Sequence, residues 1–175
     1  YGGGNGALTA VGVASAAWLI LAAVLDPVRQ LAGRGPRLTQ AALGMSVAHF
    51  GLGLFVLGVT VTTSFGLATD QRIAPGESAR IGDYEVAFKG TQPVSGPNYQ
   101  ALRGEVPITR GGKPVGTLYP EKRTYAVRTS PMTEAGIDAG WSRDLFVALG
   151  DELGGGAWSV RLQYKPLVRF IWLGA

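Results

Sequence analysis

Residues Leu38–Phe65 read LTQAALGMSVAHFGLGLFVLGVTVTTSF, and this stretch decides the fold class because it contains a single ionisable side chain, His49. A helix rises about 1.5 Å per residue, so a run of this length can cross a bilayer core of about 30 Å with some tilt. Gly44, Gly51 and Gly58 recur at seven-residue intervals and mark one face where another helix can approach closely. We therefore predict a transmembrane helix over residues 38–65.

The segment before it is also apolar. Gly6–Leu25 contains no charged side chain and is long enough to span a bilayer. A cleaved signal peptide is a poorer interpretation, because no basic region precedes the segment. Asp26 followed by Pro27 is predicted to end the helix. We assign residues 1–26 to a first transmembrane helix.

The connection between these two helices is basic. Residues 27–37 contain Arg29, Arg34 and Arg37 and no acid. Short loops rich in arginine and lysine stay on the cytoplasmic side of a membrane. We predict a cytoplasmic loop here, which puts the chain beyond residue 65 on the opposite side.

The composition changes after residue 65. Segments with alternating apolar and polar residues, such as Tyr84–Phe88 and Leu145–Leu149, are separated by glycine- and proline-containing turns. This spacing is typical of a small antiparallel barrel or sandwich. We predict an extracytoplasmic all-β domain over residues 66–164.

The last residues return to apolar sequence. In residues 165–175, Pro166 suits the first turn of a helix, and Trp172 with Arg169 suits a membrane interface. We predict the start of a final transmembrane helix. Because the chain lacks an initiator methionine and stops within an apolar run, we expect it to be a fragment of a larger polytopic protein.

Composition excludes several classes of function. The chain has no cysteine, which excludes disulfides, thiolate catalysis and cysteine-based metal sites. The net charge is +4 and the mean hydropathy is +0.18, but the basic residues are interleaved with acids. We therefore expect no nucleic-acid partner.

His49 is the main candidate for chemistry. An ionisable side chain at membrane depth is costly without a partner, and a neutral imidazole in a helical bundle can ligate haem iron. Gly53 lies four residues later on the same helical face and leaves room for a porphyrin edge, while Met45 and Ser46 lie one turn earlier. The alternative is that His49 only forms a hydrogen bond with a neighbouring helix.

A charged triplet marks the β domain. Glu121, Lys122 and Arg123 are flanked by Tyr119 and Tyr125. One interpretation is a hairpin with a solvated charged face. The other is a docking surface for a protein or for the acidic edge of a cofactor.

Several motifs, taken in order, resemble the C-terminal part of the CcmF/NrfE family of cytochrome c-type biogenesis haem lyase subunits. The first, on the glycine-rich helix, is Gly44-Met45 with Ala48-His49. The others are Gly82-Asp83-Tyr84, Pro97-Asn98-Tyr99, Leu118–Arg123, Met132-Thr133-Glu134, Asp144–Gly150, Trp158 and Lys165–Gly174. The resemblance covers most of the chain and is weakest over residues 1–37.

This resemblance implies a multi-pass protein of the bacterial inner membrane whose β domain lies in the periplasm. Such a subunit binds a b-type haem and helps attach haem covalently to apocytochrome c. Its partners are a haem chaperone, other cytochrome c maturation subunits and the apocytochrome substrate. His49 matches the family histidine that ligates the b-type haem from the last part of the chain.

The second haem ligand and the haem-handling segment belong to earlier parts of the family sequence. We therefore expect this piece alone not to catalyse thioether formation between haem vinyl groups and cysteines. The alternative function is a membrane-anchored periplasmic β domain that serves only as a docking or assembly module without a cofactor.

Overall fold

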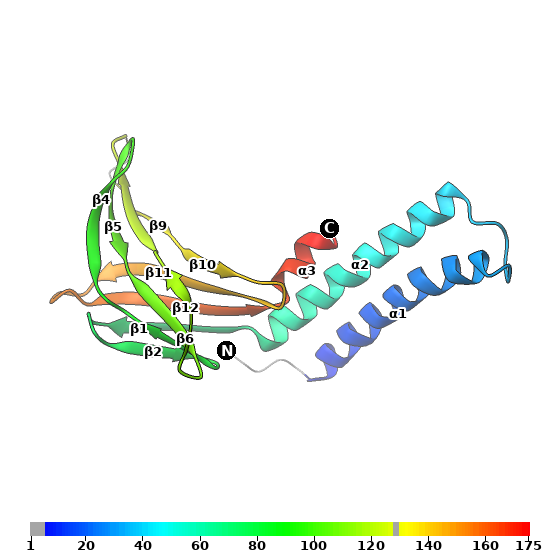
Figure 1. Ribbon diagram of the computed structural model, residues 1–175, viewed down its shortest axis with the longest axis horizontal. Coiled ribbons are helices and arrows are strands. Elements are labelled where there is room, and N and C mark those ends of the chain that lie inside the picture. Colours follow the sequence, from blue (N-terminus) through cyan, green and yellow to red (C-terminus); the bar gives the residue numbers. More distant parts are fainter. Residues whose placement is uncertain (1–5, 128–129) are drawn as a thin grey trace. The chain divides into compact units, whose positions relative to one another are not determined.

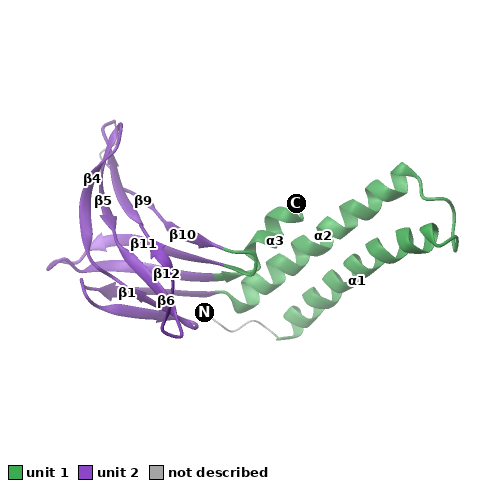
Figure 2. Ribbon diagram, in the orientation of Figure 1, with its two compact units in different colours: residues 1–66, 140–143, 165–175 green, residues 67–139, 144–164 purple. Residues whose placement is uncertain are grey.

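The computed structural model describes residues 6–127 and 130–175. These form two compact units (Figure 2). The first contains the helices with residues 140–143 and 165–175, and the second contains residues 67–139 and 144–164. Residues 1–5 of the predicted first span lie outside the described part of the chain.

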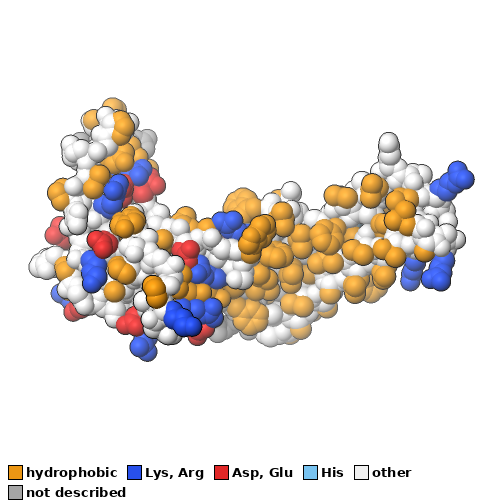
Figure 3. All heavy atoms as spheres, viewed as in Figure 1, with side chains coloured by type: hydrophobic (Ala, Val, Ile, Leu, Met, Phe, Trp, Pro, Cys, Tyr) orange, Lys and Arg blue, Asp and Glu red, His pale blue; other side chains and the backbone are white. Residues whose placement is uncertain are grey.

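The first unit is built on a helical hairpin of α1 (Gly6–Leu31) and α2 (Gln40–Phe65) (Figure 1). Thr39 caps α2, because its hydroxyl accepts a hydrogen bond from Ala42 N at 3.1 Å. The Thr9 and Ser64 hydroxyls lie 2.8 Å apart and join the other end of the hairpin. Both helices are long and apolar enough to cross a membrane, and hydrophobic side chains cover much of their visible surface (Figure 3).

The prediction that the first helix ends at Asp26-Pro27 was wrong, because α1 continues to Leu31. Proline removes one backbone donor, but the next turn keeps its hydrogen bonds, including Ala32 N to Val28 O at 3.0 Å. The end comes at Gly33, whose φ of 71° is left-handed. A glycine in this conformation is a common helix terminator, and Gly33 was therefore the stronger stop signal.

The seven-residue glycine spacing on α2 is explained by a third helix, α3 (Val168–Leu173). A Cβ atom on Gly58 would lie 2.8 Å from Ile171 N, and one on Gly51 would lie 3.1 Å from Gly174 O. Small residues permit such close approach of two backbones, and at Gly58 even a Cβ atom would force α3 to shift. Gly44 has no described atom that its Cβ would meet within 4 Å, so the predicted contact face is confirmed at two of the three positions.

Pro166 was predicted in the first turn of a helix, but it is the last residue of strand β12. The chain turns at Leu167, whose φ of 52° is left-handed, and α3 begins at Val168. Two hydrogen bonds hold this turn: Leu167 N donates to Ser142 O at 3.0 Å, and Thr62 Oγ1 donates to Pro166 O at 2.7 Å. Strand β12 extends as far as Pro166 because these contacts give hydrogen-bond partners to Pro166 O and to the N–H of the following Leu167.

The second unit is the β domain. Its strands are β1 (Leu67–Ile73), β2 (Ser78–Ile81), β3 (Tyr84–Ala87), β4 (Thr91–Ser95), β5 (Tyr99–Gly104), β6 (Val106–Arg110), β7 (Lys113–Leu118), β8 (Glu121–Tyr125), β9 (Met132–Glu134), β10 (Gly136–Ala139), β11 (Arg143–Glu152) and β12 (Trp158–Pro166). They form three four-stranded sheets, with orders β1-β12-β11-β10 (sheet A), β2-β3-β6-β7 (sheet B) and β4-β5-β8-β9 (sheet C).

The hydrophobic core lies between sheets A and B. Its fully buried side chains include Leu149 and Leu162 from sheet A and Val86 and Ile108 from sheet B. Two facing sheets with one core match the sandwich form of the prediction. Sheet C is the third sheet of the domain, and its outer strand β4 contains Pro93. The outer strand β7 of sheet B likewise contains a proline, Pro114.

Candidate functional site

His49 lies beside a cavity between α1 and α2. The cavity has a volume of about 230 Å³. Its walls are formed by Trp18, Leu19, Ala22, Ala23, Asp26, Met45, Ser46 and His49. Met45 and Ser46 therefore share the face of His49, as their spacing on the helix predicted.

A hydrogen bond fixes the protonation pattern of the His49 ring. Nδ1 lies 2.8 Å from the carbonyl oxygen of Met45, one turn earlier on α2. Because a carbonyl oxygen can only accept, Nδ1 carries the proton and donates it. In the neutral ring, the lone pair is then on Nε2. The predicted alternative, a hydrogen bond to a neighbouring helix, does not occur among the described residues.

Sequence reasoning missed the five cavity residues on α1, which are Trp18, Leu19, Ala22, Ala23 and Asp26. Trp18 and Asp26 lie on α1, and with Ala22 they follow four-residue spacing along one face of that helix. This periodicity was visible in the sequence. What was missing was the pairing of the two helices, which places this face beside His49.

Gly53 has a different position from the one we expected. It is buried against α1, where a Cβ atom would lie 2.6 Å from Ile20 Cγ1 and 3.3 Å from Ala16 O. The space beside Gly53 is therefore filled by the neighbouring helix. In this structure the glycine packs against α1 and does not line the cavity beside His49, and a place for Gly53 beside a haem stays a prediction.

The charged triplet of the β domain is not a solvated face. Glu121 is only 4 % exposed and accepts hydrogen bonds of 2.6 Å from Nε of both Arg103 and Arg123. Burial alone would raise the pKa of Glu121, but the hydrogen bonds from Arg123 and Arg103 outweigh it and hold the pKa below its ordinary value. The solvated-hairpin interpretation was wrong at this residue.

Nor do the three side chains share one face, because successive residues of a strand point to opposite sides of the sheet. Arg123 lies over the Tyr99 ring at 4.5 Å and contacts Glu134 at 3.5 Å. Lys122 Nζ instead donates to Gly150 O at 2.9 Å. A docking role for Glu121, Lys122 and Arg123 stays a prediction, but they do not form a single surface.

Comparison with known proteins identifies the family. A family model described as the CcmF C-terminal beta-sandwich matches residues 64–166. The cytochrome c-type biogenesis protein CcmF of Pseudomonas fluorescens is 46% identical over 164 residues, covering 91% of this chain and 25% of the relative. CcmF of Escherichia coli strain K12 is 41% identical over 168 residues, covering 96% of this chain and 26% of the relative.

Two further matches extend this result. The cytochrome c-type biogenesis protein NrfE of Haemophilus influenzae is 37% identical and covers 91% of this chain. A solved structure of the cytochrome c heme lyase CcmF has the same fold, with a TM-score of 0.73 at 17% identity, covering 98% of this chain and 32% of that chain. The chain spans about a quarter of the length of the curated relatives it matches. It belongs to the CcmF family of cytochrome c-type biogenesis proteins.

Proposed function

We propose that this chain forms the C-terminal part of a haem lyase subunit and that His49 Nε2 is an axial ligand of a b-type haem. The observation that carries this proposal is the 2.8 Å hydrogen bond from His49 Nδ1 to Met45 O. Ligating histidines commonly donate their other ring N–H to a carbonyl, which fixes the tautomer and strengthens the ligand. The family membership gives the same residue a place in cytochrome c biogenesis.

The surroundings of His49 fit one side of a haem. The cavity walls are mainly apolar, including Trp18, Leu19 and Met45. At about 230 Å³ the cavity is smaller than the ~300–1,000 Å³ of sites that enclose a ligand. Other segments of the full-length protein would therefore complete the site, including a second axial ligand, since His49 is the only histidine in this chain.

A bound b-type haem would supply one-electron chemistry. The residues of this chain would hold and orient it: Met45 O keeps the proton on Nδ1, and the apolar walls limit access of water. His49 lies nine residues after the start of α2, roughly 13 Å along the helix. With the arginine loop on the cytoplasmic side, the haem would lie toward that half of the bilayer.

The same topology supports a location in the bacterial inner membrane with the β domain in the periplasm. There the full-length protein would meet a haem chaperone, other maturation subunits and apocytochrome c. Formation of thioether bonds between haem and the cysteines of apocytochrome c is proposed for the full-length lyase. This segment contributes a haem ligand and a β domain to that assembly.

The test is the haem content of the full-length protein. His49→Ala should lower the amount of b-type haem bound per protein by at least about tenfold. Loss of a residue that only supports a metal ligand lowers affinity by about this factor, and loss of the ligand itself should lower it at least as much. The measurement is the absorption spectrum of the purified, reduced protein together with a pyridine haemochrome assay. Ser46→Ala is the matched control, since Ser46 lines the same cavity without a ring nitrogen.

If His49→Ala retains its haem with an unchanged spectrum, the ligand assignment is wrong. A full-length protein without any haem would instead favour the docking-module function.

A further inference from the structure

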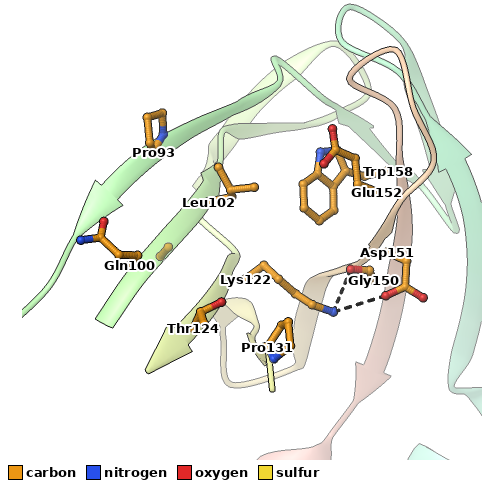
Figure 4. Close-up of a pocket in the computed structure, with 11 residues that line it drawn as sticks. Pro93, Gln100, Leu102, Lys122, Thr124, Pro131, Gly150, Asp151, Glu152 and Trp158 are labelled. Atoms are coloured by element: carbon orange, nitrogen blue, oxygen red, sulfur yellow. Dashed lines mark hydrogen bonds and ion pairs between the residues drawn. The ribbon is translucent and has the colours of Figure 1, made fainter. Parts of the chain in front are cut away.

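The β domain contains a cleft of about 410 Å³, distinct from the cavity beside His49. It lies between sheet C and the ends of β11 and β12 (Figure 4). It is lined by Pro93, Gln100, Ala101, Leu102, Lys122, Thr124, Pro131, Gly150, Asp151, Glu152 and Trp158. Its size is in the range of sites that bind small ligands or a few side chains.

One part of the cleft is apolar. Leu102 from β5 and the Trp158 ring from β12 border it, with Pro93 on the outer strand β4 (Figure 4). Trp158 is 3 % exposed, and its Nε1 has no hydrogen-bond partner among the described residues. A rigid aromatic wall beside an aliphatic side chain suits an apolar group of a ligand.

The charged side chains of the cleft leave a net negative rim. Lys122 is already engaged, because its Nζ donates to Gly150 O at 2.9 Å and lies 3.7 Å from Asp151 Oδ1. The Asp151 side chain is 92% exposed. Glu152 is exposed and forms no ion pair within residues 6–127 and 130–175. One lysine therefore faces two carboxylates, in a protein whose total charge is +4.

We propose that this cleft binds a peptide segment of a partner protein in which an apolar side chain lies next to a lysine or arginine. The apolar side chain enters between Leu102 and Trp158, and the cation reaches Glu152 and the exposed side of Asp151. Charge complementarity argues for a cation, because the only lysine in the cleft is neutralised from within. Gln100 and Thr124 line the same cleft and offer polar groups to a peptide backbone.

The experiment uses the full-length protein in detergent and two fluorescein-labelled seven-residue peptides. One alternates phenylalanine with lysine, and the other alternates phenylalanine with glutamate. Fluorescence anisotropy should show that the lysine peptide binds at least about fivefold more tightly than the glutamate peptide, and that its affinity falls as salt rises.

The variant Glu152→Lys should weaken binding of the lysine peptide at least about fivefold, because it reverses the charge at the rim. Glu105→Lys is the matched control: it makes the same charge change outside the cleft and should bind the peptide like the unchanged protein. Both should keep the thermal stability of the parent. Equal affinity for the two peptides, no binding up to millimolar peptide, or unchanged affinity in Glu152→Lys would each overturn the proposal.

Discussion

Replacement of Glu121 by alanine should lower the free energy of unfolding of the β domain by about 3 kcal/mol, since it removes two charge-assisted hydrogen bonds. The carboxylate is buried and accepts 2.6 Å bonds from Arg103 and Arg123. Without it, the two arginines are left beside each other, and among the described residues only Arg123 retains an acidic partner, Glu134. Urea unfolding of the full-length protein, followed by tryptophan fluorescence, measures the change.

The control for this loss is an exposed ion pair of the same domain. Arg110 contacts Asp83 at 3.1 Å, but both side chains are more than half exposed. Asp83→Ala should therefore lower the free energy of unfolding far less than Glu121→Ala does. Equal losses for Asp83→Ala and Glu121→Ala would contradict the importance we give to burial of Glu121.

The lowered pKa of Glu121 also predicts how the stability of the β domain depends on pH. Its pKa in the folded protein lies below the ordinary glutamate value of 4.5, because the arginine hydrogen bonds outweigh the effect of burial. A carboxyl group whose pKa is lower in the folded than in the unfolded protein stabilises the fold at any pH above its unfolded-state pKa. This stabilisation is lost as the pH falls through the folded-state pKa. The parent should lose stability more steeply than Glu121→Gln below about pH 4.5.

The second large effect is expected from Gly53→Leu. A Cβ at this position would lie 2.6 Å from Ile20 Cγ1 and 3.2 Å from Ile20 N, and the latter is backbone and cannot rotate away. Overpacking of this kind costs about 1–3 kcal/mol or more. A free-energy cost of this size lowers the equilibrium constant for pairing of α1 with α2 by about 5- to 150-fold.

Pairing of these helices can be measured by cross-linking. The Thr9 and Ser64 hydroxyls are 2.8 Å apart, and the chain has no cysteine of its own. Cysteines introduced at both positions should form a disulfide that mass spectrometry detects, and Gly53→Leu should reduce its yield. Gly44→Leu is the matched control, because no described atom lies within 4 Å of its added Cβ. Equal yields in the two variants would refute the packing role of Gly53.

The helices were predictable because their signal is local. The uncharged run and the glycine spacing of residues 38–65 gave α2 to within two residues at its start. The end of α1 was misjudged because Pro27 was weighed above Gly33. A single proline removes one hydrogen bond, whereas a left-handed glycine reverses the chain.

The charged triplet shows what a local pattern cannot give. Glu121 looked solvated because its sequence neighbours are charged, yet one of its partners, Arg103, is on the adjacent strand 18 positions earlier. The opposite directions of Lys122 and Arg123 follow from strand alternation, but only after the strand is placed. The turn from Pro166 to α3 likewise depends on Thr62 and Ser142, which are distant in sequence.

His49 was found from composition alone, whereas its cavity was not. Trp18 and Asp26 become neighbours of His49 only when the register between α1 and α2 is known. That register is set by small residues at the contact, such as Gly53 against Ala16. Many registers between two apolar helices satisfy the same apolar pattern. The residues of α1 that line the cavity could therefore not be predicted from the sequence.

The prolines on the outer strands have a consequence for how copies of the protein behave at high concentration. Pro93 in β4 and Pro114 in β7 each remove a backbone donor from a strand at the border of a sheet. A border strand without a full row of donors is a poor template for a strand from another molecule. At these two borders the domain is protected against edge-to-edge aggregation during synthesis and assembly.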